Sequence, residues 1–438
     1  MAEHESPPEE QPPETVPEGN HGPLAGLVVL DLGRILAAPL LTQILGDLGA
    51  TIIKIERPGS GDDTRQWGPP FVESTLRDGG LFSAYYLAVN RNKHSLAIDI
   101  TTGKGRELVR RLAAASDIVV ENHKVGGLAR YGLAYEDLSK INPGLIYCSI
   151  TGFGQNGPLA SRPGYDAMIQ AMGGIMSITG EPGGNPVKVG VAIADVMTGM
   201  YGAVAILAAL NHRNNSGEGQ YIDLSLFDCQ LSWLVNEGMN WLIGGQIPRA
   251  LGSAHPNIVP YQAFAAADGH FMLAVGNDSQ FAAMCAVVGR PELANDERFA
   301  TNAGRVENRE VLIPLLAAIF GRGKRDEWLA MLEEANVPCG PINSIPEALG
   351  CEQAKAREMV MSMRAGHVTS GPLDFLASPI KMSKTPVSYR KFPPAVGEDT
   401  FTVLNGMLGM SAGEIDALAG EGVISMPTGG HGPEEGDG

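Results

Sequence analysis

The sequence predicts an α/β protein with a doubly wound, mostly parallel sheet and a second, smaller α+β domain. Strand and helix patterns alternate from about residue 22 to about residue 213, the order that places helices on both faces of a parallel sheet. The chain has 438 residues, which is too many for one ordinary core. Gly and Ala are abundant and aromatic residues make up only 6%, as in α/β enzymes with closely packed helices.

The first elements have the pattern of a βαβ unit. Residues 26–33 (GLVVLDLG) are an apolar run bounded by glycines, which predicts a strand, and 38–49 have the periodicity of a helix. Residues 50–56 (ATIIKIE) predict the next strand. The alternation continues with a strand at 93–100, a helix at 103–116, and strands at 117–122 and 145–152. Glu56 ends the second strand, but no GxGxxG follows the first strand, so we reject nicotinamide binding.

The pattern changes near residue 214. Residues 221–245 begin as a strand and continue as a long helix, and 255–276 contain two short strands around Asp268-Gly269, which is a hairpin pattern. Helices predicted at 279–289 and 309–335 complete a smaller α+β domain. The stretch 371–395 is Pro-rich and extended, and 400–422 return to a helical pattern.

The net charge of −17 lies largely in two Pro/Gly-rich tails. Nine acids and no Lys or Arg fall within residues 1–22 and the last five residues, which leaves −8 for the rest. We expect both tails to be disordered and expect no nucleic-acid binding, because the remainder has no basic excess. The five Cys lack metal-site spacing, which favours reduced thiols without zinc. We see no signal peptide and no transmembrane run, and expect a cytoplasmic protein with no membrane partner.

Polar and basic residues gather near the ends of the predicted strands. Because ligands of doubly wound sheets bind where the strands end, several cations there indicate an anionic ligand. Taken singly, each is more often a solvated surface charge. The set consists of Arg57, Arg91, Lys93, His94, Asn122, His123, Lys124 and Arg130.

Asp195 ends the apolar run GVAIAD and precedes a long apolar helix pattern. Aspartate is a preferred N-cap, and on the residues alone the structural cap is the favoured interpretation. The same position also suits a carboxylate that stays ionised and acts as a nucleophile, since it faces the positive end of the helix dipole. The same two interpretations, a structural cap and a reactive carboxylate, apply to Asp166. We expect it to cap a helix at 167–176, with Tyr165 packed beneath.

Several motifs resemble the class III CoA-transferases, the CaiB/BaiF type, in order from about Pro23 to about Pro394. They include LAGLVVLDLGRILAAPLLTQILGDLGATIIKIERPGSGDD, NRNKHSLAIDI, VVENHKVGGLARYGL, RPGYDAMIQAMGG and GVAIADVMTGMYG. The segments SAHPNIVPYQAFAAADG and VPCGPINS are most similar to the succinate–hydroxymethylglutarate CoA-transferase branch. The resemblance implies CoA as a substrate, with no metal and no permanently bound cofactor.

The resemblance also assigns residues. Asp195 matches the family's catalytic aspartate. Positions that match the CoA-binding and thioester-facing residues are Arg34, Leu36, Ala37, Arg57, Ile98, Asp99, Ile100, Thr101, Asn122, His123, Lys124, Arg130, Tyr165 and Asp166. The related racemases have His where this chain has Tyr165, and tyrosine is a poor base at neutral pH. Formyl-CoA transferase has Gln where this chain has Leu36, which disfavours formate and oxalate.

The family fold implies a Rossmann-like large domain built from both chain ends, and two interlocked monomers. The domains expected are a tail at 1–22, the large domain at 23–215 and 371–425, a linker helix at 216–250, the small domain at 251–337, a linker at 338–370 and a tail at 426–438. The implied reaction transfers CoA from an acyl-CoA such as succinyl-CoA to a dicarboxylic acid, through an anhydride and a thioester on Asp195. The alternatives are a 2-methylacyl-CoA racemase and a CoA-binding protein without catalysis.

Overall fold

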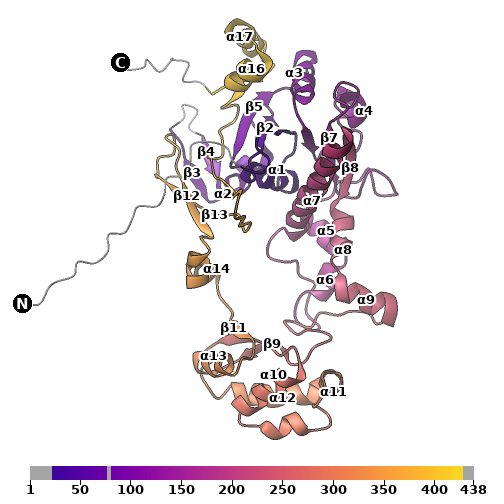
Figure 1. The fold of residues 1–438 in the computed structure, drawn as a ribbon, viewed down its shortest axis with the longest axis vertical. Coiled ribbons are helices and arrows are strands. Elements are labelled where there is room, and N and C mark those ends of the chain that lie inside the picture. Colours follow the sequence, from indigo (N-terminus) through magenta and orange to yellow (C-terminus); the bar gives the residue numbers. More distant parts are fainter. Residues whose placement is uncertain (1–21, 76–79, 428–438) are drawn as a thin grey trace, which may run out of the picture.

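A computed structural model describes residues 22–75 and 80–427 (Figure 1). The two expected tails, 1–22 and 426–438, therefore lie outside the described residues except for Gly22, Met426 and Pro427. The main feature is a seven-stranded sheet of order β14-β5-β2-β1-β6-β7-β8. Its strands are β1 (Val28–Asp31), β2 (Thr51–Glu56), β5 (Lys93–Ile98), β6 (Ile118–Glu121), β7 (Ile146–Thr151), β8 (Gln220–Ser225) and β14 (Ile424–Ser425).

Six of these strands are parallel, and β14 alone pairs antiparallel, with β5. Neighbouring side chains along each strand point to opposite faces. In β1, Val29 enters one core and Leu30 enters the other. The expected α/β class and parallel sheet are confirmed.

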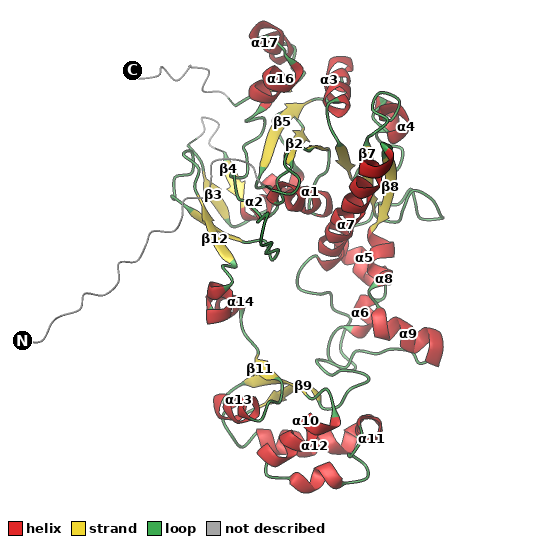
Figure 2. Cartoon of the chain, viewed as in Figure 1, coloured by secondary structure: helices red, strands yellow, loops and turns green. Residues whose placement is uncertain are grey.

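Helices cover both faces of the sheet (Figure 2). One core contains side chains of α1 (Ala37–Asp47) and α7 (Ile193–Ser216). The opposite core contains α3 (Gly103–Ala114), α16 (Thr400–Leu408) and α17 (Ala412–Gly420). Residues from both chain ends therefore share one core, since Leu404 and Ile415 lie in the same cluster as Leu30.

A smaller unit lies at the lower end of the view (Figure 1). It contains the antiparallel strands β9 (Tyr261–Ala265), β10 (His270–Ala274) and β11 (Cys339–Pro341), which confirms the predicted hairpin. Its helices are α10 (Asp278–Val287), α11 (Asn302–Glu307), α12 (Arg309–Phe320) and α13 (Arg325–Glu334). The predicted single helix 309–335 is wrong, because the chain leaves helical geometry at residues 321–324, where two glycines occur.

Two separate segments of the chain connect the small unit to the part that contains the large sheet (Figure 1). One includes α14 (Ile345–Gly350), and the other runs past α6 (Ile175–Ile178) and α9 (Val235–Gly244). The strand predicted at the start of 221–245 is confirmed as β8, but the long helix predicted after it is divided into α8 (Leu226–Ser232) and α9. The chain breaks between the helices, and Val235 has a positive φ of 41°. Shorter elements are α2 (Ala84–Ala88), α4 (Tyr135–Leu138), α5 (Asp166–Met172), α15 (Glu352–Ala356) and the hairpin-like pairs β3 (Phe71–Glu73) with β4 (Leu81–Ser83) and β12 (Val360–Met363) with β13 (Leu373–Leu376).

Strand pairing extends the large sheet beyond residue 215, the boundary expected from the sequence. β8 pairs with β7 along its whole length, from Gln220 opposite Ile146 to Ser225 opposite Thr151. The three-stranded sheet likewise extends past residue 337, because β11 pairs with β10.

Candidate active site

Asp195 lies on the wall of a pocket of about 150 Å³ at the carboxyl ends of the central strands. The loops that follow β1, β6 and β7 form its other walls. This is the edge where ligands of doubly wound sheets bind. Of the residues predicted from the sequence, those lining this pocket are Arg34, Leu36, Ala37, Asn122, His123, Lys124, Tyr165 and Asp195.

A second pocket, of about 250 Å³, shares Arg34 and His123 with the first. It contains the other predicted binding residues, namely Arg57, Ile98, Asp99, Ile100, Thr101 and Arg130. The two shared residues make the pockets adjacent. A long ligand can therefore reach Asp195 with one end while its other end contacts residues after β2 and β5.

Asp195 is the third residue of α7, in its first turn, and is not the N-cap. The predicted capping role is therefore wrong: the N-cap is Ala192, and it makes no side-chain hydrogen bond. Asp195 is partly buried. Burial, followed by repulsion from Asp166, raises the pKa of Asp195 to about 7. At neutral pH the free carboxylate of Asp195 is therefore only partly ionised.

Asp166 supports the backbone that carries Asp195. Its Oδ1 accepts a hydrogen bond from the backbone N–H of Ala194 at 2.8 Å and a longer one from that of Asp195 at 3.4 Å, while Oδ2 accepts one from Gln170 at 2.7 Å. The prediction that Asp166 caps the next helix is wrong, because α5 begins at Asp166 itself and has no side-chain cap. Of the described residues that the family resemblance assigned to the site, Asp166 is the one that lines neither pocket.

Tyr165 does not pack beneath α5 as predicted. Its side chain is 62% exposed, and it lines the pocket of Asp195. Arg162 lines the same pocket and was missed. The sequence does place this arginine three residues before Tyr165. A single arginine in a loop is too common, however, to be identified as a site residue from the sequence.

The cations of the two pockets differ in their partners. Arg34 and Arg57 both contact Asp63, at 3.0 and 2.7 Å. Lys124 and Arg130 contact no carboxylate within the described part of the chain, and the Arg130 guanidinium stacks on Tyr131 with 4.6 Å to the ring centre. These two positive charges remain available to an anion.

His123 carries no charge at neutral pH. Burial, and then the positive charge of Arg34, lower the pKa of His123 to about 4. Its imidazole can therefore donate or accept a hydrogen bond, but it adds no positive charge to the pocket.

Three of the predicted cations contact acids away from the two pockets. Arg91 pairs with Asp47 at 2.6 Å, Lys93 pairs with Asp31 at 3.2 Å, and His94 contacts Asp399 at 3.0 Å. All three lie at or before the start of β5, whereas Ile98 ends this strand. They therefore lie away from the carboxyl-end pockets, and the prediction that they bind an anionic ligand is wrong.

Among the residues that the structure describes, no group of three or more His, Cys, Asp or Glu is arranged to hold a metal ion. The chemistry available at Asp195 is therefore that of a carboxylate among arginine, lysine and backbone groups.

The chain matches the family model of CoA-transferase family III over residues 24–400. The chain belongs to this family. As a family III CoA-transferase it is an enzyme, and its substrates include CoA thioesters. A solved CaiB/BaiF family protein from Brucella suis has 48% sequence identity and a TM-score of 0.77, covering 88% of this chain and 99% of that one.

Two relatives have named activities. A succinate–glutarate CoA-transferase of Agrobacterium fabrum is 49% identical over 385 residues, which cover 87% of this chain and 95% of the relative. A succinyl-CoA:glutarate CoA-transferase of Mus musculus is 44% identical over 404 residues, which cover 92% and 91%.

Proposed function

We propose that this CoA-transferase moves CoA from succinyl-CoA to a dicarboxylic acid such as glutarate, with Asp195 as the covalent acceptor. One observation carries the proposal: among the described residues that line the pocket, Asp195 is the only acid, and three cations, Arg34, Lys124 and Arg162, line it too. The names of the two relatives support the choice of succinyl-CoA and glutarate.

The reaction proceeds by four acyl exchanges. The Asp195 carboxylate attacks the thioester carbonyl, the C–S bond breaks, and a succinyl-aspartyl anhydride and CoA thiolate form. The thiolate attacks the aspartyl carbonyl, which releases succinate and leaves an aspartyl-CoA thioester. The acceptor carboxylate attacks that thioester and forms a new anhydride with thiolate release. The thiolate then attacks the acceptor's carbonyl, which yields the new acyl-CoA and frees Asp195.

The surroundings of Asp195 suit this sequence. Leu36 and Ala37 line the pocket at the start of α1, whose N-terminus has no side-chain cap, so its first N–H groups are free to stabilise an oxyanion. The second pocket, with Arg57 and Arg130, suits the phosphates of CoA. Asp166 lines neither pocket and supports the Asp195 backbone from outside them.

We also propose that the enzyme is a homodimer. By length and composition α7 is long and apolar enough to cross a membrane, and it leaves apolar side chains such as Val204 exposed. On α9, Leu242 is 75% exposed and Ile243 is 80% exposed. Apolar surface of this extent is typical of an interface, and a second copy that covers it would also exclude water from the reactive anhydride. A monomeric mass in analytical ultracentrifugation would contradict the dimer.

The test of the reaction is Asp195→Ala, assayed by mass spectrometry for glutaryl-CoA formed from succinyl-CoA and glutarate. We expect no transfer. The matched control is Asp228→Ala, because Asp228 is the third residue of α8, is exposed and lines neither pocket. Hydroxylamine added during turnover should modify Asp195 and no other acid. Normal transfer by Asp195→Ala would refute the mechanism.

The racemase alternative has a separate readout. In deuterium oxide, a racemase exchanges the α-hydrogen of a 2-methylacyl-CoA without any acceptor acid, whereas the proposed reaction leaves that C–H bond intact. Deuterium uptake without transfer would therefore replace the proposed function with isomerisation.

A further inference from the structure

The loop from Gly33 to Ala37 joins β1 to α1 and contributes to both pockets. Ile35, Leu36 and Ala37 line the pocket of Asp195, and Arg34 lines both. Ile35 has a φ of +72°, in the left-handed region. A β-branched residue is rarely found there, because its side chain clashes with its own backbone. The site therefore has one wall in a strained conformation.

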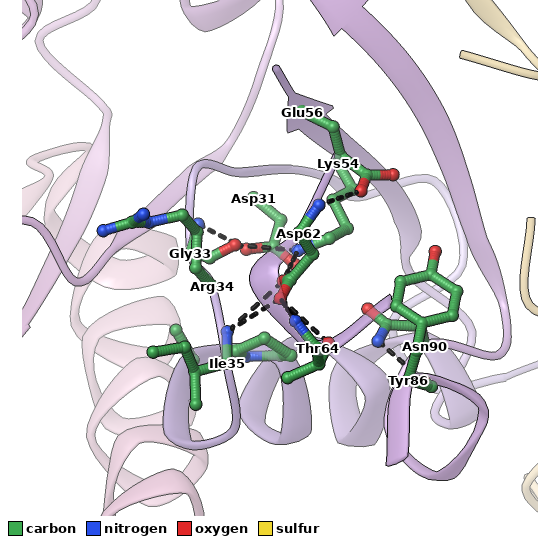
Figure 3. A network of polar contacts seen from close by, with 12 residues as sticks. Asp31, Gly33, Arg34, Ile35, Lys54, Glu56, Asp62, Thr64, Tyr86 and Asn90 are labelled. Carbon is green, nitrogen blue, oxygen red and sulfur yellow. Dashed lines mark hydrogen bonds and ion pairs between the residues drawn. The ribbon is translucent and has the colours of Figure 1, made fainter. Parts of the chain in front are cut away.

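Side chains hold every polar backbone group from the Gly33 N–H to the Ile35 N–H. Figure 3 shows how Asp31, Lys54 and Asp62 lie around this loop. Asp31 accepts a hydrogen bond from the Gly33 N–H at 2.8 Å, and the Lys54 ammonium donates one to the Gly33 carbonyl at 2.7 Å. Asn122 accepts from the Arg34 N–H at 2.9 Å and donates to the Arg34 carbonyl at 2.7 Å. The path of the loop is thus fixed by residues from β1, β2 and the end of β6.

The fifth of these backbone groups is the N–H of Ile35, the residue in the strained conformation. Both carboxylate oxygens of Asp62 lie 3.3 Å from the Ile35 N–H, and Oδ2 lies 3.0 Å from the Lys54 ammonium. The side chains of Asp62 and Lys54 are fully buried. Thr64 donates to the same carboxylate through its N–H and its hydroxyl. Burial alone would raise the pKa of Asp62, but the attraction of Lys54 and these hydrogen bonds lower it to about 2, so it stays charged.

Strained backbone persists only where the surroundings over-determine it, and it occurs preferentially at functional sites. A buried ion pair is a poor source of stability, because taking two charges out of water costs about as much as their attraction returns. The Lys54–Asp62 pair is therefore better explained by what it holds than by the stability it adds. What it holds is the loop beside Asp195.

We infer that Asp62 and Lys54 are positioning residues for CoA transfer. They keep Ile35 in the left-handed conformation and so fix Leu36 and Ala37 against the pocket of Asp195. The inference rests on the proposed function, since it concerns the placement of that pocket's wall. Without the pair, Ile35 relaxes to an ordinary backbone conformation and the start of α1 moves relative to Asp195.

Two variants at residue 35 separate the backbone conformation from the side chain. Ile35→Gly and Ile35→Ala both remove the side chain, but only glycine adopts positive and negative φ freely. We expect kcat of Ile35→Gly to equal or exceed that of Ile35→Ala, because Asp62 and Lys54 remain in place and glycine adopts the left-handed conformation without strain. The melting temperature of Ile35→Gly should likewise equal or exceed that of Ile35→Ala. A kcat of Ile35→Gly about tenfold or more below that of Ile35→Ala would overturn the inference, because the activity would then not follow the left-handed conformation.

The ion pair is tested by Asp62→Asn, with Asp47→Asn as its matched control. Asp47 forms a buried pair with Arg91 at the other end of α1, so its variant also breaks a buried pair but leaves the loop's contacts intact. We expect Asp62→Asn to lower kcat at least tenfold more than Asp47→Asn at a temperature where both are folded, and Asp62→Glu to recover part of it. Losses of kcat that simply follow the melting temperatures of the two variants would overturn the inference.

Hydrogen exchange provides a readout that does not depend on activity. The amide of Ile35 should exchange faster in Asp62→Asn, and at the wild-type rate in Asp47→Asn. If the wild-type enzyme transferred no CoA, the proposed function would fail, while this exchange pattern would still support or refute the hold of Asp62 on the loop. Wild-type exchange at Ile35 in Asp62→Asn would refute it.

Discussion

Replacing Asp195 with asparagine should stabilise the protein at pH 8 while it abolishes CoA transfer. The reason is the raised pKa of Asp195, about 7 against an ordinary 3.8. The folded protein binds the proton more tightly than the unfolded chain does. The stability that this group contributes is therefore fully present below pH 3.8 and is lost as the pH rises to about 7, above which it stays constant. Asparagine cannot ionise and avoids that loss.

The magnitude follows from the two pKa values. Each pKa unit corresponds to about 1.36 kcal/mol, so the charged form of Asp195 lowers the free energy of unfolding by about 4 kcal/mol at pH 8. About 3 kcal/mol of this develops between pH 5 and pH 8. At about 2.1 cal/mol/K per residue, the unfolding entropy of 438 residues is about 0.9 kcal/mol/K, so the melting temperature of Asp195→Asn should gain about 3 °C on the wild type over this interval.

The assay is thermal unfolding of both proteins by circular dichroism at pH 5 and pH 8. At each pH, the melting temperature of the wild type is subtracted from that of Asp195→Asn, and the two differences are compared. The effect of the amide on packing is the same at both pH values, so it cancels in this comparison. Asp416→Asn, at an exposed position of α17, is the control and should show no such change. A difference between Asp195→Asn and wild type that is the same at pH 5 and pH 8 would refute the reasoning.

The remaining predictions concern rate and stability. kcat/KM for succinyl-CoA should rise about tenfold per pH unit up to about pH 7 and then level off, because attack needs the ionised Asp195; a stopped-assay profile that is flat from pH 5.5 to 8 would contradict this. Asp166→Asn should move the midpoint of that profile to lower pH, since it removes the repelling charge, and an unmoved midpoint would mean that burial alone sets the pKa. Arg305→Ala should cost about 3 kcal/mol or more in urea unfolding, because the buried guanidinium donates to two backbone carbonyls and Asp278; the exposed Arg298→Ala is its control and should cause no measurable loss, and equal losses would contradict the assignment.

Periodicity and glycine boundaries were sufficient to predict the parallel strands and their covering helices. The short strands β3 and β4 were missed because three residues carry too little alternation to be recognised. The pairing of β14 with β5 was also beyond the sequence patterns, since its two residues depend on tertiary contacts for their conformation.

The ends of the predicted strands indicated correctly which residues lie together at the site. They did not indicate which acids the basic residues contact. Lys93 and Arg91 were predicted to face a ligand, but each finds an acid on β1 or α1, far away in sequence. Nothing in the pattern indicates which carboxylate a lysine will meet. The environment of Asp195 could not be predicted either, because its burial and its proximity to Asp166 result from the packing of α5 against α7.

The antiparallel contact of β14 has a consequence for synthesis of the chain. The Asp99 N–H donates to the Val423 carbonyl at 2.8 Å, and Ile424 lies opposite Ile98, so one wall of the second pocket is held by residues made last. Ribosomes add about 5–20 residues per second, and tens of seconds therefore separate β5 from its final neighbour. During that time β5 is an open edge, and the core of α3 lacks the side chains of α16 and α17. The nascent protein must keep this surface from aggregating, and a premature stop before residue 400 would leave it exposed permanently.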